Sequence, residues 1–138
     1  MSFGTRRREA SEGLSQRTER LGSQIVDAGL AVHKALGPGL MESVYEHCLA
    51  YELQQRSLTV RRQVPLPVTY KGVSLDAGYR LDLVVDDTVI VEIKSVEAVS
   101  RLFEAQVLTY LRLSSMRLAF LMNFNVPLFK QGLRRYVR

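Results

Sequence analysis

Two short runs rich in β-branched residues, 80–85 and 89–94, constrain the fold of this chain more than any other feature. Only three residues with hairpin-loop composition, 86–88, separate them, so the pattern predicts two antiparallel strands joined by a tight loop. Each run also carries an acid inside an otherwise apolar strand: Asp82 in the first and Glu92 in the second. Because it is costly to bury a carboxylate without a partner, something must compensate for both acids.

The length of the loop decides which face of the hairpin the acids occupy. A three-residue loop places Asp82 directly opposite Glu92, and the period of two puts Lys94 on the same face. The other face is then apolar, with Val85 opposite Val89, Leu83 opposite Val91, and Leu81 opposite Ile93. A two-residue loop would send the acids to opposite faces and is therefore disfavoured.

A face that holds two acids needs positive charge. Two carboxylates about 4 Å apart repel each other by roughly 4 kcal/mol at an effective dielectric of 20, and a divalent cation relieves this more completely than one lysine. Oxygen ligands suit Mg²⁺ or Mn²⁺. The alternative is a structural ion pair on an exposed sheet face, between Lys94 and either Asp82 or Glu92. These residues alone leave both possibilities open.

The remaining elements follow from periodicity and from turn signals. A helix from about residue 25 ends at Gly37-Pro38-Gly39, and a second helix runs to about residue 57. The pattern then predicts strands at 59–70, 73–85 and 89–94, a helix at 99–113, and strands at 118–124 and 133–137. The order α-α-β-β-β-α-β-β indicates an α+β or mixed α/β domain. Two prolines, Pro65 and Pro67, place the first strand at a sheet edge.

Composition sets the domain organisation and the class of partner. The chain has 138 residues and a net charge of +5, which fits one domain and favours a polyanion such as nucleic acid. Residues 1–22 are polar and basic, so we expect a flexible arm or a loosely held first helix, followed by a single domain over 23–138. One cysteine, Cys48, and the lack of a long apolar run or signal peptide predict a cytoplasmic protein without a membrane segment.

Several common catalytic designs are missing from the sequence. It contains no GxxxxGK[ST], GxGxxG, HExxH or GxSxG motif. The two histidines, His33 and His47, are expected to be packed or surface residues, and Cys48 is expected to be a small core residue. The strand acids are therefore the main candidates for chemistry.

These residues, together with two further motifs, resemble a known superfamily. Asp82 followed by Glu92-Ile93-Lys94 is similar to the motif of PD-(D/E)XK nucleases, and Gln106 to Tyr110 matches the QxxxY motif of their RecB-like branch. Gly39-Leu40-Met41-Glu42-Ser43-Val44-Tyr45 matches the signature of the GxxExxY protein family. The resemblance extends from about residue 25 to 135 and implies a restriction-endonuclease-like core, a central mixed sheet flanked by helices.

The resemblance also implies roles for individual residues. Asp82 and Glu92 would hold the metal, and Lys94 would orient or activate the attacking water. Glu42 would assist the metal, a role that Glu46 could share; the alternative for Glu42 is an ordinary first-turn glutamate favoured by the helix dipole. Gln106 and Tyr110 would position Lys94 or a phosphate, or else form a buried hydrogen-bonded pair. Asn123 is a polar candidate without an assigned role.

The function implied is a metal-dependent nuclease that uses Mg²⁺ or Mn²⁺ to hydrolyse phosphodiester bonds of nucleic acid, with DNA favoured over RNA. A protein partner would supply specificity. The alternative is a catalytically silent module of the same fold that binds nucleic acid or a protein. Five arginines are candidates for phosphate contacts: Arg61, Arg62, Arg80, Arg101 and Arg112.

Overall fold

A computed structural model describes residues 13–138, so residues 1–12 of the expected arm lie outside the described part. Helix α2 (Gln16–Leu36) begins at Ser15, whose side chain accepts a hydrogen bond from the Thr18 N–H. The helix starts at Gln16, earlier than the start expected near residue 25, and Leu21 and Gly22 in its added turns are already buried. The apolar stripe of α2 therefore begins within the segment that composition alone marks as polar.

The Gly-Pro-Gly turn and helix α3 (Glu42–Gln55) follow α2. Gly37 and Gly39 adopt φ angles of 69° and 100°, which other residues rarely tolerate. The hydroxyl of Tyr45 donates to the Gly37 carbonyl and accepts from the Leu40 N–H at 3.1 Å. Tyr45 therefore ties the turn to the first turn of α3.

The main sheet has five strands in the order β1-β4-β5-β6-β7. Their bounds are β1 (Val60–Pro65), β4 (Arg80–Val85), β5 (Val89–Lys94), β6 (Leu118–Asn123) and β7 (Leu133–Val137). Only β5 and β6 are parallel, and helix α4 (Arg101–Ser114) connects them. The expected mixed sheet and the edge position of β1 are both confirmed.

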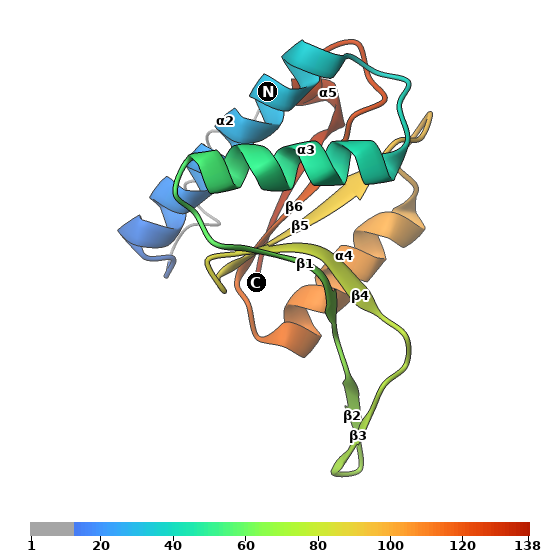
Figure 1. Cartoon of the computed structure of the whole chain (residues 1–138). Helices are drawn as coiled ribbons and strands as arrows, with labels where there is room; N and C mark the ends of the chain where they lie inside the picture. Colours follow the sequence, from blue (N-terminus) through green and yellow to red (C-terminus); the bar gives the residue numbers. More distant parts are fainter. Residues whose placement is uncertain (1–12) are drawn as a thin grey trace.

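The chain between β1 and β4 forms a small separate hairpin of β2 (Val68–Tyr70) and β3 (Val73–Leu75). Two of the expected strands, 59–70 and 73–85, are thus each broken into two. Proline at positions 65 and 67 explains the first break, since proline has no N–H to donate to a ladder. The hairpin projects away from the main sheet (Figure 1).

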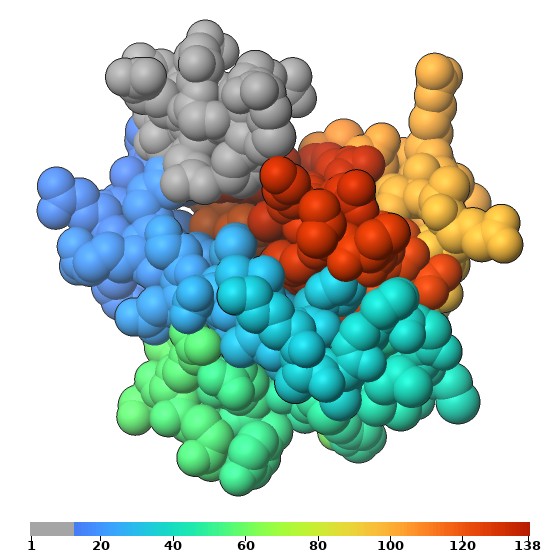
Figure 2. Space-filling view, turned by 90° about the horizontal axis from the view of Figure 1, so that it is seen from above, coloured from blue at the N-terminus to red at the C-terminus, as the bar shows by residue number. Residues whose placement is uncertain are grey.

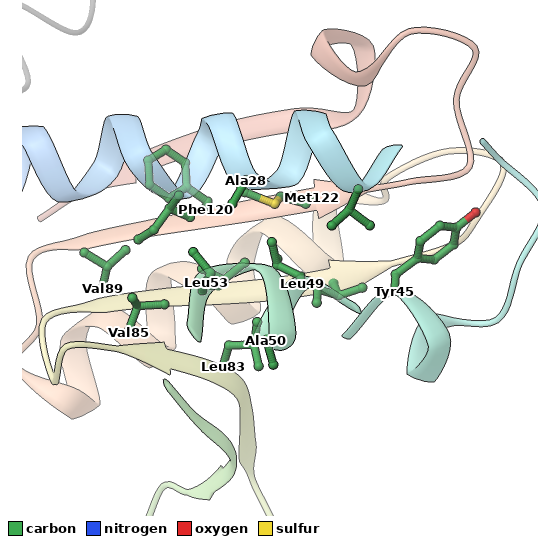
Figure 3. Packing of buried hydrophobic residues seen from close by; sticks show 14 of the residues in the cluster. Ala28, Tyr45, Leu49, Ala50, Leu53, Leu83, Val85, Val89, Phe120 and Met122 are labelled. Carbon is green, nitrogen blue, oxygen red and sulfur yellow. The ribbon is translucent and has the colours of Figure 1, made fainter. Parts of the chain in front are cut away.

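Helices cover both faces of the sheet, which gives three layers (Figure 1). Helices α2 and α3, which lie along the face seen in Figure 2, and the short α5 (Phe129–Gly132) pack on one side. Figure 3 shows part of this core, in which α3 residues Leu49 and Leu53 meet strand residues such as Val89. Helix α4 covers the other face, through Val107, Tyr110 and Leu111.

The pairing of β4 with β5 follows the three-residue loop: Val85 pairs with Val89 and Leu83 with Val91. The expected position of Leu81 opposite Ile93 on one apolar face is wrong. Leu81 belongs to the core under α4, whereas Ile93 belongs to the core under α2 and α3. Leu81 and Leu83 of β4 therefore point to opposite faces of the sheet, although residues two apart in a regular strand share a face. The strand is irregular at Asp82, which lies between them.

Candidate functional site

The backbone ladder between β4 and β5 stops just before the two acids. Its last pair is Leu83 with Val91. Beyond it, the Asp82 N–H donates to Glu92 Oε2 at 2.8 Å, and the Ile93 N–H donates to Asp82 Oδ2 at 2.8 Å. Each carboxylate thus satisfies a backbone N–H of the neighbouring strand, and the sequence-predicted neighbours Asp82 and Glu92 come together.

The neighbouring strand β1 is irregular at the same level. In the pairing of β1 with β4, Arg62 pairs with Leu83 and Val64 pairs with Leu81. Gln63 and Asp82, which lie between these pairs, do not pair with each other. Gln63 has a φ of 53°, which is uncommon for a residue with a side chain. Its Nε2 donates to Glu46 Oε1 at 2.8 Å and makes a longer contact of 3.4 Å with Asp82 Oδ1. Gln63 therefore links α3 to the acid pair.

One oxygen of Glu92 remains open. The side chain is only 6% exposed, and its hydrogen bond to the backbone uses Oε2 alone. Within residues 13–138, no buried side-chain oxygen or nitrogen lacks a hydrogen-bond partner. Because Oε1 of Glu92 accepts no hydrogen bond, solvent must reach it. Glu92 thus offers a carboxylate oxygen that no hydrogen bond within residues 13–138 uses.

Burial makes both acids hard to ionise. The pKa of Glu92 rises from its ordinary 4.5 to about 8, first because of burial and then because of the Asp82 charge. Burial is also the main cause that raises the pKa of Asp82, while its hydrogen bond from Ile93 opposes the rise. Charge repulsion, which the sequence suggests as the cause, is thus second to burial at Glu92.

Lys94 lies on the α4 side of the sheet. Its Nζ is 4.2 Å from the centroid of the Phe103 ring. None of the ion pairs in the described part of the chain includes Lys94, so the structural ion pair with Asp82 or Glu92 is not formed. Its charge nevertheless lowers the pKa of both acids. The ammonium group is therefore close to the acids without being locked to either.

Helix α4 brings Tyr110 to the acids. Tyr110 is 8% exposed, and burial followed by the charges of Glu92 and Asp82 raises its pKa. Gln106 lies one turn earlier on the same helix face and is half-buried. No hydrogen bond joins Gln106 to Tyr110 among the described residues, so the buried hydrogen-bonded pair is not formed. Tyr110 instead packs edge-on against Tyr79, with ring centroids 5.9 Å apart.

The two glutamates of α3 occupy different environments. Glu42 is exposed, and its Oε2 accepts from the Ser95 N–H at 3.2 Å, one residue beyond Lys94. Glu46 is 7% exposed, and both its oxygens are engaged: Oε2 by Arg62 and Oε1 by Gln63. Glu46 raises the pKa of both Asp82 and Glu92. Glu42 therefore keeps a free oxygen, whereas Glu46 does not.

Other candidates have structural roles. Asn123 Oδ1 accepts from the Val96 N–H at 3.0 Å, and its Nδ2 donates to the Val96 carbonyl, so it holds the loop after β5. The Nε2 of His33 is 2.8 Å from the Val126 carbonyl oxygen in a packed position, as expected. Three of the candidate arginines form ion pairs: Arg61 with Asp87, Arg62 with Glu46, and Arg80 with Asp76.

Sequence reasoning missed Gln63, because neither glycine nor asparagine marks its left-handed backbone. Phe103 could have been found from its spacing, because it lies three residues before Gln106 and therefore on the same face of α4.

The donor set fits a hard divalent cation. Asp82 and Glu92 offer oxygen atoms, which Mg²⁺ and Mn²⁺ prefer. Over residues 13–138, no group of three His, Cys, Asp or Glu side chains is arranged to hold a metal ion. Such a pair suits Mg²⁺, which is usually bound through one or two carboxylates while water and substrate phosphates complete its shell.

Fold and site together define a restriction-endonuclease-like domain. A family model described as the PD-(D/E)XK nuclease superfamily matches residues 19–136, and the chain belongs to that superfamily. Its members generally use divalent metals such as Mg²⁺ and act on nucleic acid. No curated protein and no solved structure matches the chain. None of the helices within residues 13–138 is both long and apolar enough to cross a membrane.

Proposed function

We propose that this chain is a metal-dependent nuclease that hydrolyses phosphodiester bonds of nucleic acid, with DNA favoured over RNA, and that Asp82 and Glu92 hold Mg²⁺ or Mn²⁺. The observation that carries the proposal is the exchange of side-chain hydrogen bonds at the end of the β4–β5 ladder. Each acid is fixed through a backbone hydrogen bond to one oxygen. The second oxygen of Glu92 accepts no hydrogen bond from residues 13–138, and that of Asp82 has only the 3.4 Å contact with Gln63, so both are held in a defined direction before the cation binds. Membership of the superfamily supports the same conclusion.

Lys94 acts on the reaction and not on the cation. Its ammonium rests against the ring of Phe103, and no carboxylate within residues 13–138 forms an ion pair with it. A positive charge held there stabilises negative charge that develops on the phosphoryl group, and it orients the attacking water. The cation, when bound, neutralises phosphoryl charge and lowers the pKa of a water.

Tyr110 and Gln106 are the proposed positioning residues on α4. Tyr110 lies on the α4 face that packs on the sheet, and its hydroxyl makes no hydrogen bond to any residue within 13–138, so it can donate to a phosphate oxygen. Gln106 has an amide without a hydrogen-bond partner in the described structure, which leaves it available for the substrate. Both assignments agree with the QxxxY motif of the RecB-like branch.

Glu42 is proposed to assist the cation indirectly, through water or substrate, because no three acidic side chains within residues 13–138 are arranged around one metal ion. Its Oε2 is held by the Ser95 N–H at the end of β5, and its other oxygen is free. Glu46 is engaged by Arg62 and Gln63, so we assign it to holding the acid pair in place. The Tyr45 contacts that close the preceding turn position Glu42, which supports placing the chain in the GxxExxY family.

A cation titration followed by a cleavage screen tests the proposal. Mn²⁺ binding is measured by calorimetry on the unmodified chain and on Asp82→Asn, and single- and double-stranded DNA and RNA are then offered with Mn²⁺ or Mg²⁺. The proposal expects binding and cleavage by the unmodified chain and neither by the variant. Nucleic-acid binding without cleavage under any divalent cation would favour the silent module instead.

A further inference from the structure

The β2–β3 hairpin has one apolar face that nothing in the described chain covers. Its register pairs Val68 with Leu75 and Tyr70 with Val73, and these four side chains share one face. Tyr70, Val73 and Leu75 are 63%, 56% and 47% exposed. The opposite face carries Thr69 and Ser74, so the apolar residues are gathered on one side of the arm.

The hairpin is rooted at the carboxylate site. It leaves the sheet after Pro65, two residues beyond Gln63, and returns at Arg80, two residues before Asp82. At its base, the Leu66 N–H donates to the Tyr79 carbonyl at 3.0 Å. Leu66 is buried under the sheet, and the ring of Tyr79 packs against Tyr110. The base of the arm therefore lies close in sequence and in space to the acid pair, and Figure 1 shows the arm leaving the sheet between β1 and β4.

Lys71 is the one charge of the arm that lies outside an ion pair within residues 13–138, and a single free cation at the tip favours an anionic partner. Lys71 lies at the tip, with its Nζ 5.6 Å from the centroid of the Tyr70 ring, and Arg80 lies at the base. Asp76 is the one acid between them, and it is occupied by the Gly78 N–H and by Arg80 at 3.6 Å. A basic side chain beside an exposed aromatic ring is the combination that proteins use to stack unpaired bases.

The small size of the face argues against a second copy of the chain as its occupant. Four side chains bury far less than the ~1,200 Å² that a stable protein interface needs. One or two side chains are enough for nucleic acid, because aromatic rings stack on single bases and apolar wedges enter opened base steps.

We propose that the β2–β3 hairpin holds unpaired bases of the nucleic acid, with Tyr70 as the stacking residue and Lys71 at the backbone. The substrate class is then nucleic acid with a single-stranded stretch next to the bond that is cut. This inference rests on the proposed function, because it names the substrate of the same site.

Equilibrium binding without catalysis tests the arm separately from the acids. Fluorescence anisotropy of a labelled oligothymidylate and of a matched duplex is measured in EDTA with the full chain, Tyr70→Ala, Tyr70→Phe and the opposite-face control Thr69→Ala. We expect the single strand to bind more tightly than the duplex. Tyr70→Ala should weaken single-strand binding on the order of tenfold, while Tyr70→Phe and Thr69→Ala should stay within about twofold of the unmodified chain.

Three results would overturn the inference: equal affinity of Tyr70→Ala and Thr69→Ala, tighter binding of the duplex, or a dimer in sedimentation that Tyr70→Ala dissociates. Asp82→Asn separates this failure from failure of the proposed function. That variant should lose cleavage and keep the single-strand affinity, whereas Tyr70→Ala should lose affinity and retain metal binding. Thermal unfolding of each variant is the control for folding, and Tyr70→Ala should unfold at the temperature of the unmodified chain because Tyr70 is exposed.

Discussion

The two ends of the β4–β5 hairpin are built from the same kind of strand and differ in how they satisfy the backbone. Near the turn, Val85 pairs with Val89 through a regular ladder and both side chains are fully buried. At the other end, the carboxylates of Asp82 and Glu92 take over the backbone N–H groups. The end near the turn stabilises the fold through regular strand pairing. The end at Asp82 and Glu92 loses ladder hydrogen bonds, and its carboxylate oxygens are held in fixed positions instead.

The largest expected effect comes from removing charge at the acid end. Glu92→Gln keeps an oxygen that can accept from the Asp82 N–H, so the fold should persist while the cation loses a ligand. Cleavage should fall by a factor on the order of 10³ and Mn²⁺ binding should be lost. Steady-state cleavage rates and calorimetry measure both quantities. Retention of full activity by Glu92→Gln would mean that this end of the hairpin is only structural.

Replacing Lys94 separates the reaction from the cation. Lys94→Met keeps an apolar stem against Phe103 and removes the ammonium. Cleavage should fall on the order of 10², whereas Mn²⁺ affinity should persist or rise because a neighbouring positive charge is gone. A variant that loses cation binding together with cleavage, or that unfolds, would contradict the division of roles.

The pH dependence of stability should expose the buried acid. Glu92 keeps its proton up to about pH 8 in the folded state, whereas the unfolded chain releases it near its ordinary 4.5. The folded state therefore binds more protons across this range, and the free energy of unfolding should fall as pH rises, by on the order of a few kcal/mol. Denaturant unfolding without metal at pH 5, 7 and 9 measures this. In Glu92→Gln the slope should largely disappear; an equal slope in both proteins would contradict the assignment.

The smallest effect is expected from the matched change at the ladder end. Ile90 is fully buried under α4, and Ile90→Val removes one methylene from that core. The free energy of unfolding should fall by about 0.5–1.5 kcal/mol, with cleavage and cation affinity unchanged at a temperature where the variant is folded. A large loss of activity in Ile90→Val would show that the two ends are mechanically coupled.

The sequence pattern was sufficient to predict the regular end of the β4–β5 hairpin. Alternation of apolar residues and the three-residue loop 86–88 predicted the register of Leu83 with Val91, and the same loop predicted that Asp82 and Glu92 would meet. The mixed sheet with helices was likewise predictable from the order of the elements. These features depend on local preference and on period, which a single sequence carries.

The irregular end of the hairpin, around Asp82, could not be predicted in the same way. Strand periodicity assumes an unbroken ladder, so it placed Leu81 on the wrong face once Asp82 hydrogen-bonded through its side chain. The left-handed conformation of Gln63 depends on its contacts with Glu46 and Asp82, which are distant in sequence. The tight hold of Arg62 and Gln63 on Glu46, which leaves Glu42 as the freer glutamate, is also a tertiary property.

Proton release on cation binding is the sharpest test of whether Asp82 and Glu92 hold the cation. Calorimetric titration with Mn²⁺ at pH 7, in two buffers with different ionisation enthalpies, gives the number of protons released for each cation bound. Because burial raises the pKa of Glu92 to about 8, we expect the unmodified chain to release about one proton per cation and Glu92→Gln to bind no cation. Binding with no proton release, or binding of equal strength in Glu92→Gln, would contradict the assignment of this acid pair as the cation site.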